Sequence, residues 1–227
     1  EHEVHNLWNS SVAAACKARD KFGTGRVAGS IGPLIASYRP DICPPVEQAS
    51  KIYEEKVESI APKVDLLLVE TVCSLKQAKG VLAATDKSNK PVWISFSVDD
   101  VDGTKLRSGE KLEDVEAVIN NHLVEAVLIN CSPPEVVDNA LSILSKMGKA
   151  FGAYANGFSK ISSEFLKTRP TVDALTARND LGPEEYSNFV TNWIRNGASI
   201  VGGCCEIGPT HISKISQKIH KLGYKKL

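Results

Sequence analysis

The stretch Ala-Ser-Ile-Val-Gly-Gly-Cys-Cys-Glu-Ile-Gly-Pro occupies residues 198–209 and predicts a strand, a glycine turn and a helix start in direct succession. Its apolar first half is typical of a strand buried on both faces, and Pro209 suits the first turn of a helix. Two adjacent cysteines, Cys204 and Cys205, follow the glycine turn. Strand, turn and helix in this order form the repeating unit of proteins built on a parallel sheet.

The same unit recurs along the whole chain. Strand-like runs span residues 26–32, 64–71, 91–98, 126–132, 149–157 and 199–205. Helical patterns span residues 1–22, 46–61, 75–85, 112–121, 135–146, 183–197 and 209–222. This alternation predicts a parallel sheet with helices packed outside it. We expect one domain over residues 1–227, because no low-complexity segment, proline-rich linker or charge run divides the chain.

Residues with possible chemistry stand at the carboxyl ends of the expected strands. They are Glu70, Ser95, Cys131, Asn156, Cys204 and Cys205. An open sheet gathers its ligand at one switch point, whereas a (β/α)8 barrel spreads its active site over all strand ends. We therefore expect an α/β fold of the (β/α)8 TIM-barrel type. Because only six strands are recognised, the first strands of such a barrel would precede Glu1.

Three of these residues are cysteines at the ends of two apolar runs. Cys131 follows one run, and Cys204 and Cys205 follow the other. Three thiols that converge around a metal with one open position are typical of a catalytic zinc site. A structural zinc site would need a fourth protein ligand, and His211 is the nearest candidate in sequence.

The bulk composition excludes several classes of function. The 227 residues carry 27 Lys and Arg against 27 Asp and Glu, so charge gives no case for nucleic acid or an anionic membrane surface. No apolar stretch approaches the roughly 20 residues that span a bilayer. Six cysteines in a chain of this length are too few for a disulfide scaffold, so we expect a cytoplasmic protein.

Five ordered segments carry a family resemblance: VAGSIGP at 27–33, DLLLVET at 65–71, INCS at 129–132, YANG at 154–157 and GGCC at 202–205. Together they resemble the homocysteine S-methyltransferase family, a group of zinc-dependent (β/α)8 barrels. The segments SYRP at 37–40 and DGTKLRSG at 102–109 resemble its bacterial members. The resemblance covers nearly all of the chain.

The resemblance implies a cofactor, a substrate and roles for particular residues. It implies that Cys131, Cys204 and Cys205 bind zinc, and that Glu70, in the Glu-Thr motif with Thr71, holds the amino acid part of homocysteine. The implied reaction moves a methyl group from a small donor to the homocysteine thiol and gives methionine. We expect an onium donor, because neither a folate nor a cobalamin domain is recognised. The family's glycine-rich first strand with its acidic residue is not found in this sequence.

Other interpretations stay open at this point. Glu70 could be a salt-bridge partner at the strand ends, and Ser95 and Asn156 could either support a ligand or form turns. The acceptor could be selenohomocysteine or another small thiol. A non-catalytic or degenerate barrel that binds zinc or a thiol is a further alternative. Homocysteine and the methyl donor are the expected partners, nucleic acid and membrane are not, and a homo-oligomer is possible.

Overall fold

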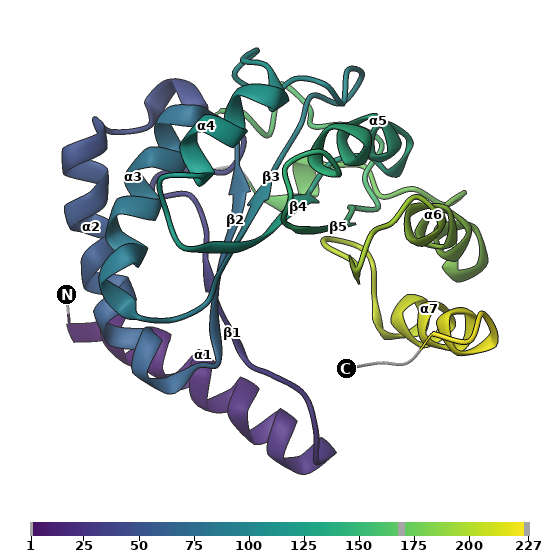
Figure 1. Cartoon of the computed structure of the whole chain (residues 1–227), viewed down its shortest axis with the longest axis horizontal. Helices are drawn as coiled ribbons and strands as arrows, with labels where there is room; N and C mark the ends of the chain where they lie inside the picture. Colours follow the sequence, from purple (N-terminus) through teal and green to yellow (C-terminus); the bar gives the residue numbers. More distant parts are fainter. Residues whose placement is uncertain (1, 168–170, 225–227) are drawn as a thin grey trace. The chain divides into compact units, whose positions relative to one another are not determined.

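The computed structural model describes residues 2–167 and 171–224, which form an α/β fold around a parallel sheet (Figure 1). Six strands lie in the order in which they occur along the chain. They are β1 (Ala28–Ile31), β2 (Leu66–Val72), β3 (Val92–Phe96), β4 (Val124–Asn130), β5 (Ala150–Tyr154) and β6 (Ile200–Val201). The expected α/β class and parallel sheet are confirmed.

Helices separate most of these strands along the chain. The α-helices among the described residues are α1 (His2–Phe22), α2 (Val46–Ile60), α3 (Leu75–Thr85), α4 (Val115–Ile119), α5 (Pro134–Leu144), α6 (Pro183–Arg195) and α7 (Pro209–Lys221). Several short 3-10 turns lie between them, including Leu112–Asp114 directly before α4. None of the described helices combines the length and apolar character that a membrane crossing requires.

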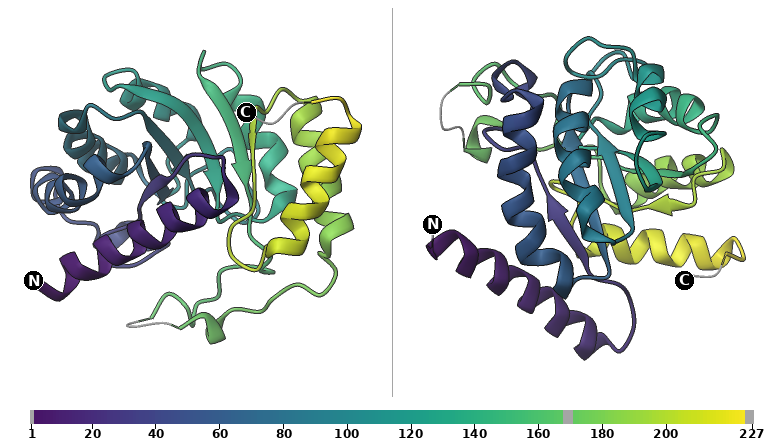
Figure 2. Two further views of the ribbon diagram at one scale, coloured as in Figure 1. Left: turned by 90° about the horizontal axis from the view of Figure 1, so that it is seen from below. Right: turned by 60° about the vertical axis from the view of Figure 1, so that its left-hand side comes forward.

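The chain divides into two compact units, of which the first holds residues up to Ser95 together with Asp114–Ala126. In this unit β1 pairs in parallel with β2, and Ala28 stands opposite Leu66. Helices α2 and α3 lie side by side (Figure 2). Their close approach needs Gly80, because a Cβ atom there would lie 2.9 Å from the Cβ of Ala49.

The second unit holds Phe96–Glu113 and the chain from Val127 onward. Here β5 pairs in parallel with β6, and Gly152 stands opposite Ile200. A Cβ atom at Gly152 would lie 1.7 Å from the carbonyl oxygen of Ile200, so only glycine fits this pairing. Helices α6 and α7 lie side by side in both figures.

Several local signals act as the sequence predicts. Ser74 caps α3, since its hydroxyl accepts a hydrogen bond from the Gln77 N–H at 3.1 Å. Gly148 and Gly197 adopt positive φ angles of 66° and 98° after α5 and α6. Several elements are shorter than expected. The largest differences are in β6, which ends at Val201 instead of Cys205, in β5, which ends at Tyr154 instead of Gly157, and in α4, which covers only Val115–Ile119 of the expected 112–121.

Candidate metal and substrate site

The three cysteine sulfurs at the strand ends converge in the second unit. The Sγ atoms of Cys131 and Cys205 lie 4.0 Å apart, and those of Cys204 and Cys205 lie 3.9 Å apart. All three ligand atoms fall within 4.8 Å of one another. Three sulfurs around a tetrahedral zinc at about 2.3 Å each would stand about 3.8 Å from one another. The donor set and its spacing therefore fit a zinc ion with little adjustment.

Backbone conformation aims the first sulfur. Cys131 follows β4 directly and has a φ angle of 50°, in the left-handed region that residues with a Cβ rarely adopt. Such conformations persist only where the surrounding structure imposes them, and they are frequent at functional sites. The left-handed turn breaks the alternation of the strand at Cys131 and so redirects this side chain.

A different device places the other two sulfurs. The chain beyond β6 stays hydrogen-bonded to the segment after β5, because the Cys204 N–H donates to the Ala155 carbonyl at 2.9 Å. A Cβ atom at Gly203 would lie 2.1 Å from Cγ2 of Ile207, so the turn closes only around a glycine. Gly203 is needed for space, since neither it nor Gly202 has a positive φ.

The electrostatics of the three thiols favour a thiolate at Cys205. Hydrogen bonds from the thiols of Cys131 and Cys204 lower the pKa of Cys205. Contacts with Cys131 and Cys205, together with burial, raise the pKa of Cys204. A thiolate supported by two S–H donors attracts a cation and is the form of cysteine that binds metals.

A further side chain touches this cluster, and sequence reasoning missed it. The side-chain amide of Asn130, which is fully buried at the end of β4, donates toward the Sγ of Cys204 at 3.9 Å. A donor at this position stabilises negative charge on the sulfur. Its place in the quoted motif INCS was the only sequence signal for it.

His211 does not join the cluster. Its Nδ1 accepts a hydrogen bond from the Gly208 N–H at 3.3 Å, and its Nε2 lies 3.2 Å from the Leu181 carbonyl oxygen. Both ring nitrogens are thus engaged elsewhere. Among the described residues the metal-competent group contains the three cysteines without a fourth ligand, which leaves one coordination position open.

Asn156 belongs to the same unit but forms a turn. Its Oδ1 accepts a hydrogen bond from the Phe158 N–H at 3.1 Å, and its own N–H donates to the Ser132 carbonyl at 3.1 Å. The side chain is buried. Of the two expected roles, these contacts favour the turn, which holds the segment after β5 beside the end of β4.

Glu70 and Thr71 lie at the end of β2, in the first unit. The Ser30 hydroxyl donates a hydrogen bond to Oε1 of Glu70. Thr71 has a φ angle of 60°, which is an outlier for a β-branched residue. The thiol of Cys73 donates to the Thr71 carbonyl at 3.3 Å and helps to hold this conformation. The strand end is therefore polar and conformationally fixed.

Ser95 lies near the end of β3 and is fully buried. Its hydroxyl has no hydrogen-bond partner among residues 2–167 and 171–224. Burying an unpaired hydroxyl costs about 1–3 kcal/mol, so such a group asks for an explanation.

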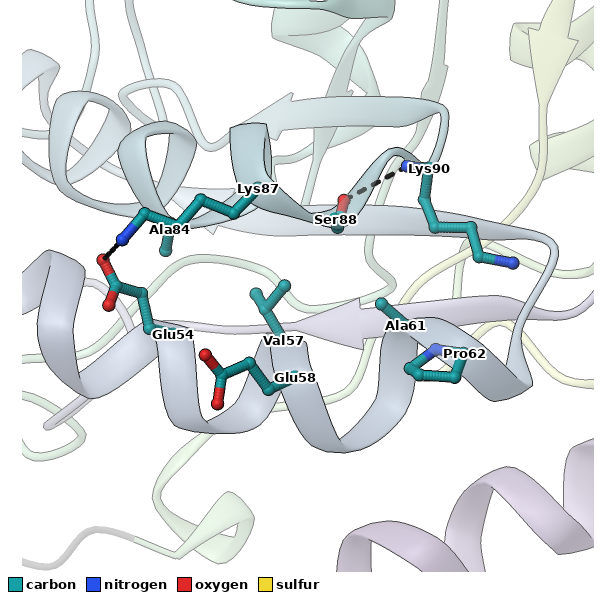
Figure 3. Close-up of a pocket in the computed structure, with 9 residues that line it drawn as sticks. All are labelled: Glu54, Val57, Glu58, Ala61, Pro62, Ala84, Lys87, Ser88 and Lys90. Carbon is teal, nitrogen blue, oxygen red and sulfur yellow. Dashed lines mark hydrogen bonds and ion pairs between the residues drawn. The ribbon is translucent and has the colours of Figure 1, made fainter.

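A surface groove in the first unit is separate from all the expected site residues. It has a volume of about 310 Å³ and lies between α2 and the turn after α3 (Figure 3). An ion pair between Lys87 Nζ and Glu54 Oε1, 2.8 Å long, crosses one side of it. None of the residues with expected chemistry lines this groove.

Comparison with known proteins gives a consistent result. The family model described as homocysteine S-methyltransferase matches residues 1–219. Homocysteine S-methyltransferase 1 of Brassica oleracea var. italica is 28% identical over 96% of this chain and 72% of its own length. Homocysteine S-methyltransferase YbgG of Bacillus subtilis is 27% identical over 95% of this chain and 71% of its own length.

A solved structure agrees with these sequence matches. The metallated form of the homocysteine methyltransferase MmuM from Escherichia coli superposes with a TM-score of 0.76 at 26% sequence identity. The match covers 94% of this chain and 70% of that one.

Proposed function

This chain belongs to the homocysteine S-methyltransferase family and is a methyltransferase, and we propose that it transfers a methyl group to the thiol of homocysteine to give methionine. We further propose that Cys131, Cys204 and Cys205 hold a zinc ion for this reaction. The observation that carries the proposal is the convergence of these three sulfurs within 4.8 Å.

The chemistry requires a nucleophilic sulfur at neutral pH. A free thiol is mostly protonated there, and only the thiolate attacks well. Zinc, when bound, supplies the positive charge that deprotonates a coordinated thiol. The thiolates of Cys131, Cys204 and Cys205 would hold the metal, and the Asn130 amide donates toward the Cys204 sulfur. The thiol proton passes to solvent, the sulfur takes the methyl group, and the donor leaves with its bonding electron pair.

We assign substrate contacts to the polar strand ends. Glu70 offers a carboxylate for the ammonium group of the amino acid, and the Ser30 hydroxyl bonded to it orients that carboxylate. The strained backbone of Thr71 supports a functional role for this turn. The unpaired hydroxyl of Ser95 supports a contact with substrate, and Asn156 supports the turn beside the cysteines.

The donor that fits this chemistry best is a small onium compound. A sulfonium or quaternary ammonium group is activated toward displacement by its own positive charge, so the protein need only align it with the attacking sulfur. A cytoplasmic location would suit the site, because the three cysteines bind a metal only as reduced thiols, and a reducing compartment keeps them so.

We also propose that the six strands belong to a (β/α)8 barrel in one domain. The consecutive order of the six parallel strands supports this, because barrels are built by adding each new strand beside the last. The likeness to the Escherichia coli methyltransferase supports it as well.

The test pairs metal content with product formation. Reduced, freshly purified protein is analysed for zinc and then assayed for methionine formation from homocysteine with a panel of sulfonium and quaternary ammonium donors. We expect about one zinc ion per chain and turnover with at least one donor. Cys204→Ser should lose both, whereas Cys16→Ser, which alters a thiol outside the cluster, should keep both.

Two other outcomes would contradict the proposal in different ways. Absence of zinc from the reduced protein would refute the three-thiol site. Zinc without turnover on any donor, with selenohomocysteine also tried as acceptor, would refute methyl transfer and favour a thiol-binding barrel.

A further inference from the structure

A buried arginine lies behind the turn that carries Cys131. The side chain of Arg107 is 10% exposed, and its ion-pair partner Asp100 is 18% exposed. The Nε of Arg107 donates to the Ser97 hydroxyl at 2.7 Å, and its Nη2 donates to Asp100 Oδ1 at 2.6 Å. The same Nη2 donates to the carbonyl oxygen of Cys131 at 3.2 Å. One guanidinium thus joins three points of the second unit.

The Cys131 carbonyl receives a second donor from the same group of residues. The Ser97 hydroxyl accepts from Arg107 and donates to this oxygen at 3.2 Å. A carbonyl oxygen has two lone pairs, so the two bonds use its full accepting capacity. Both bonds hold the peptide group of a residue whose φ angle is 50°.

Asp100 extends the network to another segment. Its second oxygen, Oδ2, accepts a hydrogen bond from the Ile161 N–H at 2.8 Å, in the connection after β5. The loop that presents Arg107 is itself fixed, because Val98 and Leu106 form an antiparallel bridge and Leu106 is fully buried. The guanidinium is therefore held in place before any ligand arrives.

We propose that Arg107 is a positioning residue for the metal centre. It fixes the left-handed peptide of Cys131 and thereby the direction in which the Cys131 sulfur points toward those of Cys204 and Cys205. The inference rests on the proposed function, because it assumes that the three thiols bind a metal. It assigns Arg107 no contact with substrate or metal.

The decisive variant is Arg107→Lys, which keeps the charge but removes the planar fork of donors. Arg178→Lys is the matched control. Arg178 lies in the same unit, its side chain is 17% exposed, and it bonds Asp180 and Glu135. Because its ion-pair partners are Asp180 and Glu135, its replacement should affect stability without moving the Cys131 sulfur.

The probe is Co²⁺, whose thiolate charge-transfer absorption reports how many sulfurs bind it. We expect Arg107→Lys to bind Co²⁺ about tenfold to a hundredfold more weakly, as is usual when a group that orients a ligand is lost. Its charge-transfer band per bound ion should also be weaker. Arg178→Lys should bind Co²⁺ within about twofold of wild type, with the band unchanged. Equal effects in the two variants, or no effect in either, would overturn the inference.

Two further measurements cover the remaining outcomes. Should Arg107→Lys fail to fold, Ser97→Ala removes one donor to the same carbonyl, and unchanged Co²⁺ affinity there would overturn the inference. Should wild type bind no metal, the proposed function fails. Hydrogen exchange at residues 129–132 then tests whether Arg107 holds the Cys131 peptide. Faster exchange in Arg107→Lys than in Arg178→Lys would support this role, and equal exchange in the two variants would refute it.

Discussion

The two turns that bring the sulfurs together are built in opposite ways. Cys131 is 5% exposed, and hydrogen bonds from Arg107 and Ser97 hold its left-handed peptide. Cys204 and Cys205 are half-buried and exposed, and their turn closes around Gly203. One turn is fixed by polar groups in the interior and the other by close packing at the surface. A metal site can therefore combine a rigid ligand with a more accessible pair.

The turn of Cys204 and Cys205 is nevertheless supported from beneath by a buried tyrosine. Tyr186 of α6 is fully buried, and its hydroxyl lies 2.8 Å from the Gly202 carbonyl oxygen and 3.2 Å from that of Ala155. Burial raises the pKa of this hydroxyl, so it stays protonated and donates. The Tyr186 ring packs edge-on against Trp193 and His211. Aromatic packing therefore supports the turn of Cys204 and Cys205, whereas hydrogen bonds from Arg107 and Ser97 support the turn of Cys131.

Replacing a cysteine in each turn should give the largest effects and separate the two designs. Both Cys131→Ser and Cys205→Ser should weaken metal binding by more than about a hundredfold, because each removes a ligand instead of its support. In the metal-free state Cys131→Ser should also lower the free energy of unfolding by about 1–3 kcal/mol, since it buries a hydroxyl. Cys205→Ser should change it by less than about 0.5 kcal/mol.

These values come from Co²⁺ titration and from urea unfolding of metal-free protein. Equal losses of stability in the two variants would remove the distinction between a buried and an accessible turn.

Substitution of the paired glycines should give the next largest effect. Gly203→Ala should lower the free energy of unfolding by about 1–3 kcal/mol, because the new methyl group overlaps the Ile207 side chain. Gly202→Ala is the control, since its Cβ would meet only Tyr154 Cβ at an ordinary 3.5 Å. Urea unfolding compares the two. A larger loss for Gly202→Ala would show that packing does not set this turn.

Removal of the tyrosine hydroxyl should have a smaller effect. Tyr186→Phe should cost about 1 kcal/mol of stability and also weaken Co²⁺ binding, because a donor to the Gly202 carbonyl is lost. Tyr53→Phe, at a buried tyrosine of α2, should cost a similar amount without changing metal affinity. Thermal melts and Co²⁺ titration measure the two effects. Unchanged Co²⁺ affinity in Tyr186→Phe would show that the Tyr186 hydroxyl does not support the turn that carries Cys204 and Cys205.

The smallest effect concerns the ion pairs between Glu184 of α6 and two lysines of α7, Lys214 and Lys218. Hydrogen bonds from Lys214 and Lys218 lower the pKa of Glu184 from 4.5 to about 2. The stabilisation is thus complete above the unfolded pKa and is lost as the pH falls toward 2. Glu184→Gln should melt slightly below wild type near pH 7, and this difference should shrink as the pH drops below about 4.5.

Glu185→Gln is the matched control, because it removes a neighbouring charge from the same first turn of α6. Thermal melts from about pH 3 to pH 7 give the comparison. A difference for Glu184→Gln that grows on acidification would contradict the assigned direction.

Local sequence signals predicted the strands and most helices, because apolar runs and caps act over a few residues. Leu75–Thr85 begins and ends where the sequence predicts, with Ser74 as its cap. The expected helix at 112–121 is shorter because its first residues, Leu112–Asp114, form a 3-10 turn. The Leu112 N–H donates to the Thr104 carbonyl at 2.9 Å, and no pattern within the segment reveals this bond to the preceding loop.

The candidate site also has features that the sequence predicts and features that it does not. Convergence of Cys131 with Cys204 and Cys205 could be predicted, since the carboxyl ends of parallel strands share one edge. The positive φ of Thr71 and the role of Arg107 could not. Both depend on contacts between segments that meet only in the folded chain.

The positions of the three cysteines in the sequence also set the order in which they are synthesised. Cys131 and Cys205 are 74 residues apart. At a synthesis rate of about 5–20 residues per second, the first thiol waits roughly 4–15 seconds for its partners to leave the ribosome. During that interval the cluster is incomplete, because two of its three thiols have not yet been made. Of the three thiols in the cluster, the one made first, Cys131, is also the one that the fold buries.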